Sequence, residues 1–194
     1  MKPTRASLPT LSFAAPDAWA AWLAAHHASS KGVWLVIAKK ASKARSITYA
    51  EALDVALAWG WIDGQKGKGD AASWLQKFTP RGRRSAWSRI NREKATALIA
   101  AGTMQPAGLA EVERAKRDGR WDAAYESQSR ASVPPDLAKA LAGNAQAARF
   151  FETLDARNRY AVLYRVHTAK KAETRARRIA TFVAMLARRE KLHP

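Results

Sequence analysis

Cysteine is missing from this 194-residue sequence, and so is any long apolar run. Without cysteine there is no disulfide framework, thiolate zinc site, iron–sulfur cluster or cysteine nucleophile. No stretch approaches the roughly 18 apolar residues that a membrane-spanning helix needs. Pro9, Pro16 and Asp17 interrupt the apolar N-terminal stretch, which argues against an export signal. We therefore expect no transmembrane segment, no metal, no cofactor and a cytoplasmic location.

Acidic residues are scarce as well. The chain has 16 Asp and Glu against 34 Lys and Arg, a net charge of +18 and a pI near 10.8. Hydrophobic residues make up 47%, enough for one compact domain or two small lobes. Three stretches, Lys31–Arg45, Lys77–Lys94 and Arg165–Arg178, carry 16 of the 18 net charges. If the fold brought two of them together, their field would attract an anionic partner.

The N-terminal half shows the spacing of two helices and a strand. Trp19, Trp22, Leu23 and His26 recur at helical intervals, which predicts a first amphipathic helix. The apolar run 33–37 predicts a buried strand. Residues 48–51, Thr-Tyr-Ala-Glu, have the pattern of a capping box, which predicts a second helix over 49–59 that ends at Gly60.

A hairpin follows this second helix. Residues 61–63 and 73–78 read as strands around a glycine- and lysine-rich turn over 64–70. With the strand at 33–37 they predict a small antiparallel sheet of about three strands, covered by helices. The fold class expected is therefore α+β.

Beyond Pro80 the pattern is helical to the end of the chain. Asp136, Asn144 and Asp155 are candidate caps of three short helices, and a last helix carries Ile179, Phe182 and Leu186 on one face. The polar segment 127–135 ends in two prolines and is the best candidate linker. We expect an α+β lobe over 1–126, a linker over 127–135 and a helical lobe over 136–194.

The loop before the helix at about residue 88 has the composition of an anion site. It places arginines beside a helix start, where free amides and guanidinium groups favour phosphate or carboxylate. The candidate binding residues are Arg81, Arg83, Arg84, Ser85, Trp87, Ser88 and Asn91, aided by Lys39 and Lys40. In the structural alternative a serine caps the helix, Trp87 fills the core and the arginines are solvated.

Trp61 and Asp63 pose a similar choice. Trp61 is a candidate for the same binding surface, although two Trp around Gly60 are more typical of a core. Asp63 is the candidate acid/base group, with Glu51 and Tyr49 as weaker ones. The alternative role for Asp63 is a structural pair with an arginine of the 81–84 loop.

Short motifs occur along the chain in a distinctive order. They include Trp19-x-x-Trp22-Leu23, Gly32-Val33-Trp34-Leu35-Val36, Tyr49-x-Glu51-Ala52, Gly60-Trp61-Ile62-Asp63-Gly64, Ser85-x-Trp87-Ser88-x-x-Asn91, Gly119-Arg120-Trp121-Asp122 and Ala169-Lys170-Lys171-x-Glu173-Thr174-Arg175. With them the sequence resembles, over nearly its whole length, the YdeI/OmpD-associated family of bacterial proteins, also called bacteriocin-protection proteins.

The resemblance implies a role in protection against bacteriocins or cationic antimicrobial peptides, and it supplies no catalytic residues. Family descriptions also suggest a periplasmic location, for which this sequence shows no export signal. Many members carry a cysteine just before the Gly-Trp-Ile-Asp segment. This chain has Ala58 and Trp59 there, so any role of that thiol cannot apply.

Three functions stay open at this stage. The first, which we favour, is non-enzymatic binding of an anionic partner, either a phosphate-bearing ligand or nucleic acid, through the basic and aromatic patch. The second is a small enzyme acting on an anionic metabolite, with Asp63 as acid or base. The third is association of the basic terminal helix with an acidic membrane surface or an acidic protein. The sequence does not indicate the ligand or the oligomeric state.

Overall fold

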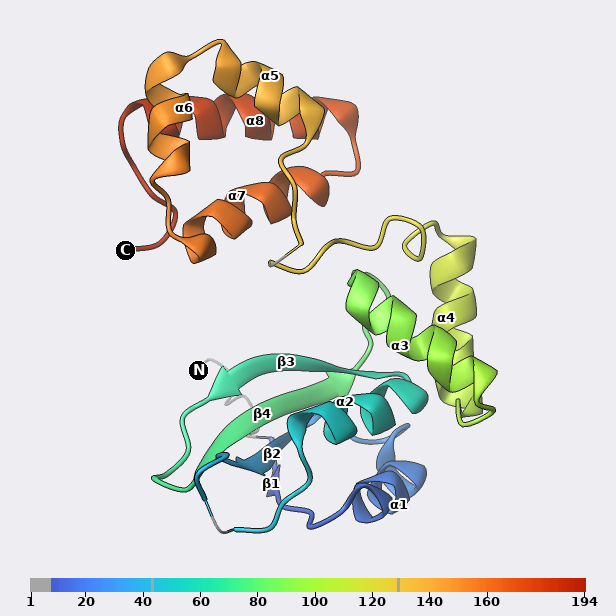
Figure 1. Ribbon diagram of the computed structural model, residues 1–194. Helices are drawn as coiled ribbons and strands as arrows, with labels where there is room; N and C mark the ends of the chain where they lie inside the picture. The colour runs from blue at the N-terminus through green and yellow to red at the C-terminus, as the bar shows by residue number, and fades with distance from the viewer. Residues whose placement is uncertain (1–7, 43, 129) are drawn as a thin grey trace, which may run out of the picture. The chain divides into compact units, whose positions relative to one another are not determined.

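The structure is a computed structural model that describes residues 8–42, 44–128 and 130–194. The chain forms two compact units (Figure 1). Unit 1 comprises the described residues up to Trp87 together with Asn91–Ala123. Unit 2 comprises Ser88–Ile90 and Ala124–Pro194.

Unit 1 is built on a four-stranded mixed sheet. The strands are β1 (Thr10–Leu11), β2 (Val33–Ala38), β3 (Trp61–Gly67) and β4 (Ser73–Pro80), in the order β1-β2-β4-β3. β1 runs parallel to β2, and the other pairs are antiparallel. The expectation of a purely antiparallel, three-stranded sheet was wrong, because β1 is only two residues long and has no hydrophobic alternation to reveal it.

Two helices cover one face of this sheet. α1 (Pro16–His26) and α2 (Tyr49–Ala58) pack beside each other, and the buried Trp19 indole donates to the Ala52 carbonyl (3.2 Å). The Trp19 ring also contacts Trp61 and Phe78 of the sheet. The core of unit 1 therefore lies between α1, α2 and this face.

The local signals around α2 are confirmed. The Thr48 hydroxyl accepts from the Glu51 amide, while the Glu51 carboxylate accepts from the Thr48 amide and hydroxyl. Gly60 follows with a φ of +73°, and a Cβ there would lie 2.9 Å from the Ala107 carbonyl oxygen. Only glycine meets both conditions without strain.

Two further helices complete unit 1. α3 (Arg89–Ala100) belongs to it from Asn91 onward, and α4 (Pro106–Arg117) packs against α2. The contact between α4 and α2 brings the Gly108 backbone directly against the Ala58 carbonyl.

Unit 2 is helical, as expected for the C-terminal part. Its helices are α5 (Pro135–Ala142), α6 (Ala145–Glu152), α7 (Ala156–His167) and α8 (Ala172–Ala187). Asn144 and Asp155 cap α6 and α7 as predicted. Asp136 does not cap α5, which begins one residue earlier at Pro135; it binds Arg175 of α8 instead. The apolar face of α8 is buried in the core of this unit.

Aromatic residues divide unevenly between the units. All eight tryptophans belong to unit 1, whereas three of the four tyrosines, Tyr125, Tyr160 and Tyr164, belong to unit 2. No helix among the described residues is long and apolar enough to cross a membrane.

Candidate functional site

The expected arginine site divides into buried and exposed residues. Arg81 is only 5% exposed, and its guanidinium carbon lies 3.5 Å from the centroid of the Trp87 ring. Its Nη1 donates to the Ala86 carbonyl (3.3 Å). Trp87 is 2% exposed and packs edge-on against Trp121. Neither side chain faces an open cleft.

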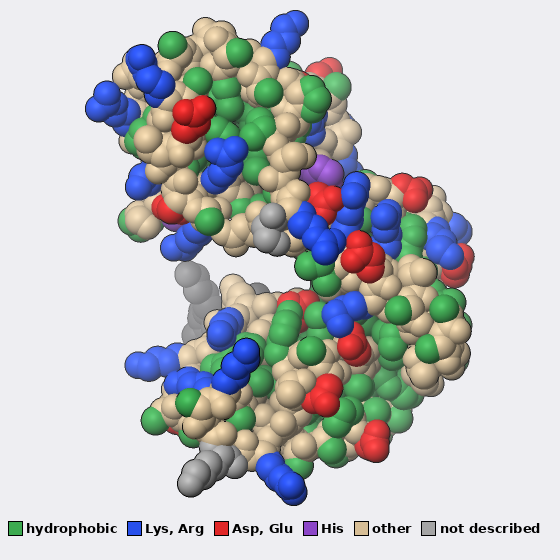
Figure 2. All heavy atoms as spheres, in the orientation of Figure 1, with side chains coloured by type: hydrophobic (Ala, Val, Ile, Leu, Met, Phe, Trp, Pro, Cys, Tyr) green, Lys and Arg blue, Asp and Glu red, His purple; other side chains and the backbone are tan. Residues whose placement is uncertain are grey.

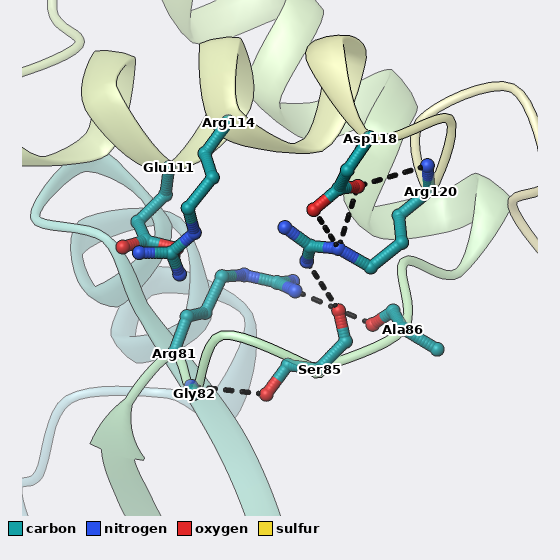
Figure 3. Close-up of polar contacts among 8 residues, drawn as sticks. All are labelled: Arg81, Gly82, Ser85, Ala86, Glu111, Arg114, Asp118 and Arg120. Atoms are coloured by element: carbon teal, nitrogen blue, oxygen red, sulfur yellow. Dashed lines mark hydrogen bonds and ion pairs between the residues drawn. The ribbon is translucent and has the colours of Figure 1, made fainter.

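A second buried arginine holds the same loop from inside the unit. Arg120 donates to the Ser85 carbonyl (2.7 Å) and pairs with Asp118 (2.8 Å). Ser85 closes the turn, since its hydroxyl accepts from the Gly82 amide (3.0 Å). Figure 3 shows the Arg81 side chain running between this pair and the Glu111–Arg114 pair of α4. These arginines fix the conformation of the loop.

The other residues of this stretch have different surroundings. Arg83 and Arg84 are exposed, whereas Asn91 is buried. Ser88 pairs with Tyr125 in an isolated β-bridge, and the Arg89 amide donates to the Tyr125 carbonyl (2.8 Å). That amide at the helix start is therefore already occupied.

The candidate acid/base residues make local hydrogen bonds. The Asp63 carboxylate accepts from the Tyr49 hydroxyl (2.8 Å). Trp61, a candidate for the binding surface, is only 1% exposed and donates its indole N–H to the His27 carbonyl. Glu51 is engaged in the capping box. The hydrogen bonds from the Thr48 backbone and side chain hold the pKa of Glu51 below its ordinary value. Glu51 is thus a structural residue.

A hollow at the end of the hairpin gathers lysines around an aromatic ring. It has a volume of about 430 Å³, and we call it the lysine hollow. Figure 2 shows Lys and Arg side chains gathered over this end of the unit. The residues that line it are Lys39, Lys40, Lys66, Gly67, Lys68, Gly69, Asp70, Ser73 and Trp74.

Backbone pairing explains why the hollow forms. Ala38, at the end of β2, pairs with Ser73 at the start of β4, which places Lys39 and Lys40 beside the β3–β4 turn. Lys39 Nζ donates to the carbonyls of Asp70 (2.7 Å) and Ala71 (3.2 Å) and so holds that turn in place. Lys39 and Lys40 were predicted to aid the arginine site, but they lie at the opposite end of β4, in the hollow, and Lys39 also has a structural role there.

The charge in the hollow is unbalanced. Asp70 carries the one carboxylate among the lining residues, and it accepts from the Ser73 hydroxyl (2.8 Å) and from the Ala72 and Ser73 amides. These hydrogen bonds lower the pKa of Asp70, and the bond from the Ser73 side chain is the largest cause. At neutral pH the carboxylate is therefore ionised, and it is already hydrogen-bonded within the turn. Lys66 Nζ lies 4.1 Å from the centroid of the half-buried Trp74 ring.

Sequence reasoning did not select Lys66, Lys68 and Trp74 as site residues. The one sequence feature that could have indicated these residues is the alternation of lysine and glycine over 66–69, and it was assigned to a turn. Only the β2–β4 register shows that this turn meets Lys39 and Lys40. Among the described residues, no group of three or more His, Asp or Glu is arranged to hold a metal ion.

The two units match different family models. Residues 11–111, just over half of the chain, match the family described as "Domain of unknown function (DUF8412)". Residues 130–189, in unit 2, match the one described as "Bacteriocin-protection, YdeI or OmpD-Associated". The N-terminal motifs of the resemblance thus fall within the first model. No curated protein and no solved structure matches the chain. The chain therefore belongs to the DUF8412 family, whose model covers residues 11–111, and its residues 130–189 match the YdeI/OmpD-associated family that the sequence motifs suggested.

Proposed function

We propose that unit 1 binds a phosphate-bearing polyanion, single-stranded nucleic acid in the first instance, at the lysine hollow. The observation that carries the proposal is the convergence of four lysines on one hollow whose single carboxylate is already hydrogen-bonded. This arrangement leaves a local excess of positive charge that a row of phosphates would neutralise, with release of their counterions.

The aromatic ring in the hollow favours a single strand over a duplex. Single-strand sites combine basic side chains that follow the backbone with aromatic rings on which bases stack. Trp74 is half-buried in the hollow, and a base would stack on its ring in place of the Lys66 ammonium, which would turn to a phosphate. Trp87, the tryptophan beside Arg81, is buried and offers no such surface.

The family description supplies a biological setting without a chemistry. It speaks of bacteriocin protection and of OmpD association, and it applies to residues in unit 2. We propose polyanion binding by unit 1 as a molecular activity that serves this role.

The test is a titration of a dye-labelled, single-stranded oligonucleotide followed by anisotropy at several salt concentrations. The double variant Lys66→Gln/Lys68→Gln should bind more weakly than the wild type. The slope of log K against log salt should fall by about 0.7 for each lysine that contacts a phosphate. Inorganic phosphate in excess should compete only weakly, because it offers a single phosphate.

Two control variants remove the same amount of charge elsewhere. Lys170→Gln/Lys171→Gln alters exposed residues of unit 2, and Arg83→Gln/Arg84→Gln alters the exposed loop arginines of unit 1. Equal losses in all three variants would mean that the net charge of +18, and not the hollow, attracts the strand. Absence of binding at low salt would refute the proposal altogether.

A further inference from the structure

Unit 2 contains a cavity of about 230 Å³ that the proposed function does not use. All of its lining residues belong to this unit. They are Arg89, Tyr125, Glu126, Ala131, Ser132, Pro134, Tyr160, Leu163, Tyr164 and His167. The cavity thus gathers all three tyrosines of unit 2.

The walls of the cavity are aromatic, and their rings contact one another. The Tyr125 and Tyr164 rings meet edge to face with centroids 4.9 Å apart, and the Tyr160 ring lies 5.9 Å from Tyr164. The Tyr160 hydroxyl donates to the Glu126 carbonyl (2.9 Å). Burial, followed by the neighbouring Tyr125 and Tyr164, raises the pKa of Tyr160 to about 12, so its hydroxyl stays neutral at physiological pH.

An ion pair and a histidine complete the lining. Arg89 Nη1 pairs with Glu126 Oε1 at 2.6 Å, and the Arg89 side chain is 51% exposed. A guanidinium has five N–H donors, so this single contact leaves most of them able to bind a second carboxylate. His167, at the C-terminal end of α7, is also exposed and lines the same cavity.

The size limits the ligand. Cavities that hold drug-sized molecules measure roughly 300 to 1,000 Å³, and this one is smaller. It suits a molecule with a single ring, whose faces and edges would pack against the tyrosines. We propose that this cavity binds a small aromatic carboxylate, with the ring among Tyr125, Tyr160 and Tyr164 and the carboxylate on Arg89.

The distribution of tyrosines provides the readout. In protein labelled with isotope only in the tyrosine rings, NMR shows four sets of ring signals, and Tyr49 in unit 1 is the internal reference. Benzoate is the probe, with benzylamine as a cation of the same shape. Benzoate should shift the signals of the three cavity tyrosines and leave Tyr49 unchanged, whereas benzylamine should shift none of them.

Two variants test the role of Arg89 in opposite directions. Arg89→Gln removes the proposed anchor and should weaken benzoate binding about tenfold or more, the size of a lost charge-assisted hydrogen bond. Glu126→Gln removes the competing carboxylate and should tighten binding. Arg117→Gln, at an exposed position of α4 in unit 1, is the charge-matched control and should bind as the wild type does.

Several results would overturn the proposal. Tyrosine signals that do not respond to benzoate would show that the cavity is not a site for this class, and equal responses to benzylamine would exclude selection for an anion. Unchanged affinity in Arg89→Gln, or binding no tighter in Glu126→Gln, would remove Arg89 from the site.

Discussion

Arginines only two residues apart have opposite environments in the 81–84 loop. Arg81 is buried against Trp87 and binds the Ala86 carbonyl, whereas Arg83 is exposed. The two arginines cannot be distinguished from the sequence, because no neighbouring residue indicates which guanidinium is buried. The Arg81 side chain lies against Trp87 and near residues that come 30 to 40 positions later, the carboxylates of Glu111 and Asp118 among them.

Replacing Arg81 with lysine should therefore destabilise the protein. An ammonium cannot reproduce the flat stack on Trp87, so Arg81→Lys should lower the free energy of unfolding by about 1–3 kcal/mol. Arg83→Lys, the matched exposed control, should leave it within about 0.5 kcal/mol of the wild type. Urea titrations followed by far-ultraviolet circular dichroism would measure both, and equal values would contradict the buried stack.

Asp155 should make the stability of unit 2 depend on pH. The Asn158 amide, and then its side chain, lower the pKa of this carboxyl below the ordinary 3.8. A depressed pKa in the folded state means that the stabilisation is complete above 3.8 and is lost as pH falls through the folded value.

Asp155→Asn keeps a side-chain oxygen for the cap but removes the titration. Stability measured at neutral pH should change little, while the loss between about pH 4 and pH 2 should be smaller than in the wild type. Urea titrations across this pH range would check it. An unchanged acid dependence would mean that Asp155 does not contribute, and that other carboxyls with a lowered pKa, such as Asp136 and Glu190 of unit 2, account for the effect.

At the scale of helices and strands, the sequence predicted the elements with strong local signals. The capping box at Thr48, the end of α2 at Gly60 and the caps Asn144 and Asp155 are confirmed. The hairpin is confirmed as well, but β3 extends to Gly67, over residues that were assigned to the turn. The caps and the helix end are decided by neighbours within about four residues, and the hairpin by the short turn that joins its two strands. The short strand β1 and the pairing of β2 with β4 depend on partners more than 20 residues away, so no local pattern could reveal them.

The same limit applies to the candidate site. Lys39 and Lys40 were selected from the sequence, but the lysines and the tryptophan that complete the hollow come from a hairpin about 30 residues later. The sheet register brings residues 66–70 close to Lys39 and Lys40, and this proximity makes the hairpin end part of the candidate site.

The close contact between α4 and α2 should be intolerant of any added side chain. A Cβ on Gly108 would lie 2.2 Å from the Ala58 carbonyl oxygen. Alanine favours a helix over glycine by about 1 kcal/mol, yet Gly108→Ala should destabilise by about 1–3 kcal/mol because α4 must move away from α2.

The neighbouring position on α4 provides the control. Leu109 is 38% exposed, so Leu109→Ala should change stability by less than about 1 kcal/mol. Circular dichroism in a urea titration would compare the two variants. A Gly108→Ala protein as stable as the wild type would show that the two helices separate without cost.

For the whole molecule, the three stretches that carry most of the net charge of +18 have different environments. The first basic stretch supplies Lys39 and Lys40 to the lysine hollow, and the second is partly buried as Arg81. The third ties helices together within unit 2, where Arg175 binds Asp136 and Arg178 donates to the Arg165 carbonyl. Net charge alone therefore identifies neither a partner nor a site.

The segregation of tryptophan has an optical consequence. Because all eight indoles belong to unit 1, light at the red edge of tryptophan absorption excites this unit alone, and unit 2 is silent in that emission. A denaturation curve recorded by emission therefore reports unit 1, while the ring signals of Tyr125, Tyr160 and Tyr164 report unit 2. Separate midpoints for the two signals would give each unit its own stability in the intact chain, and coincident midpoints would show that they unfold together.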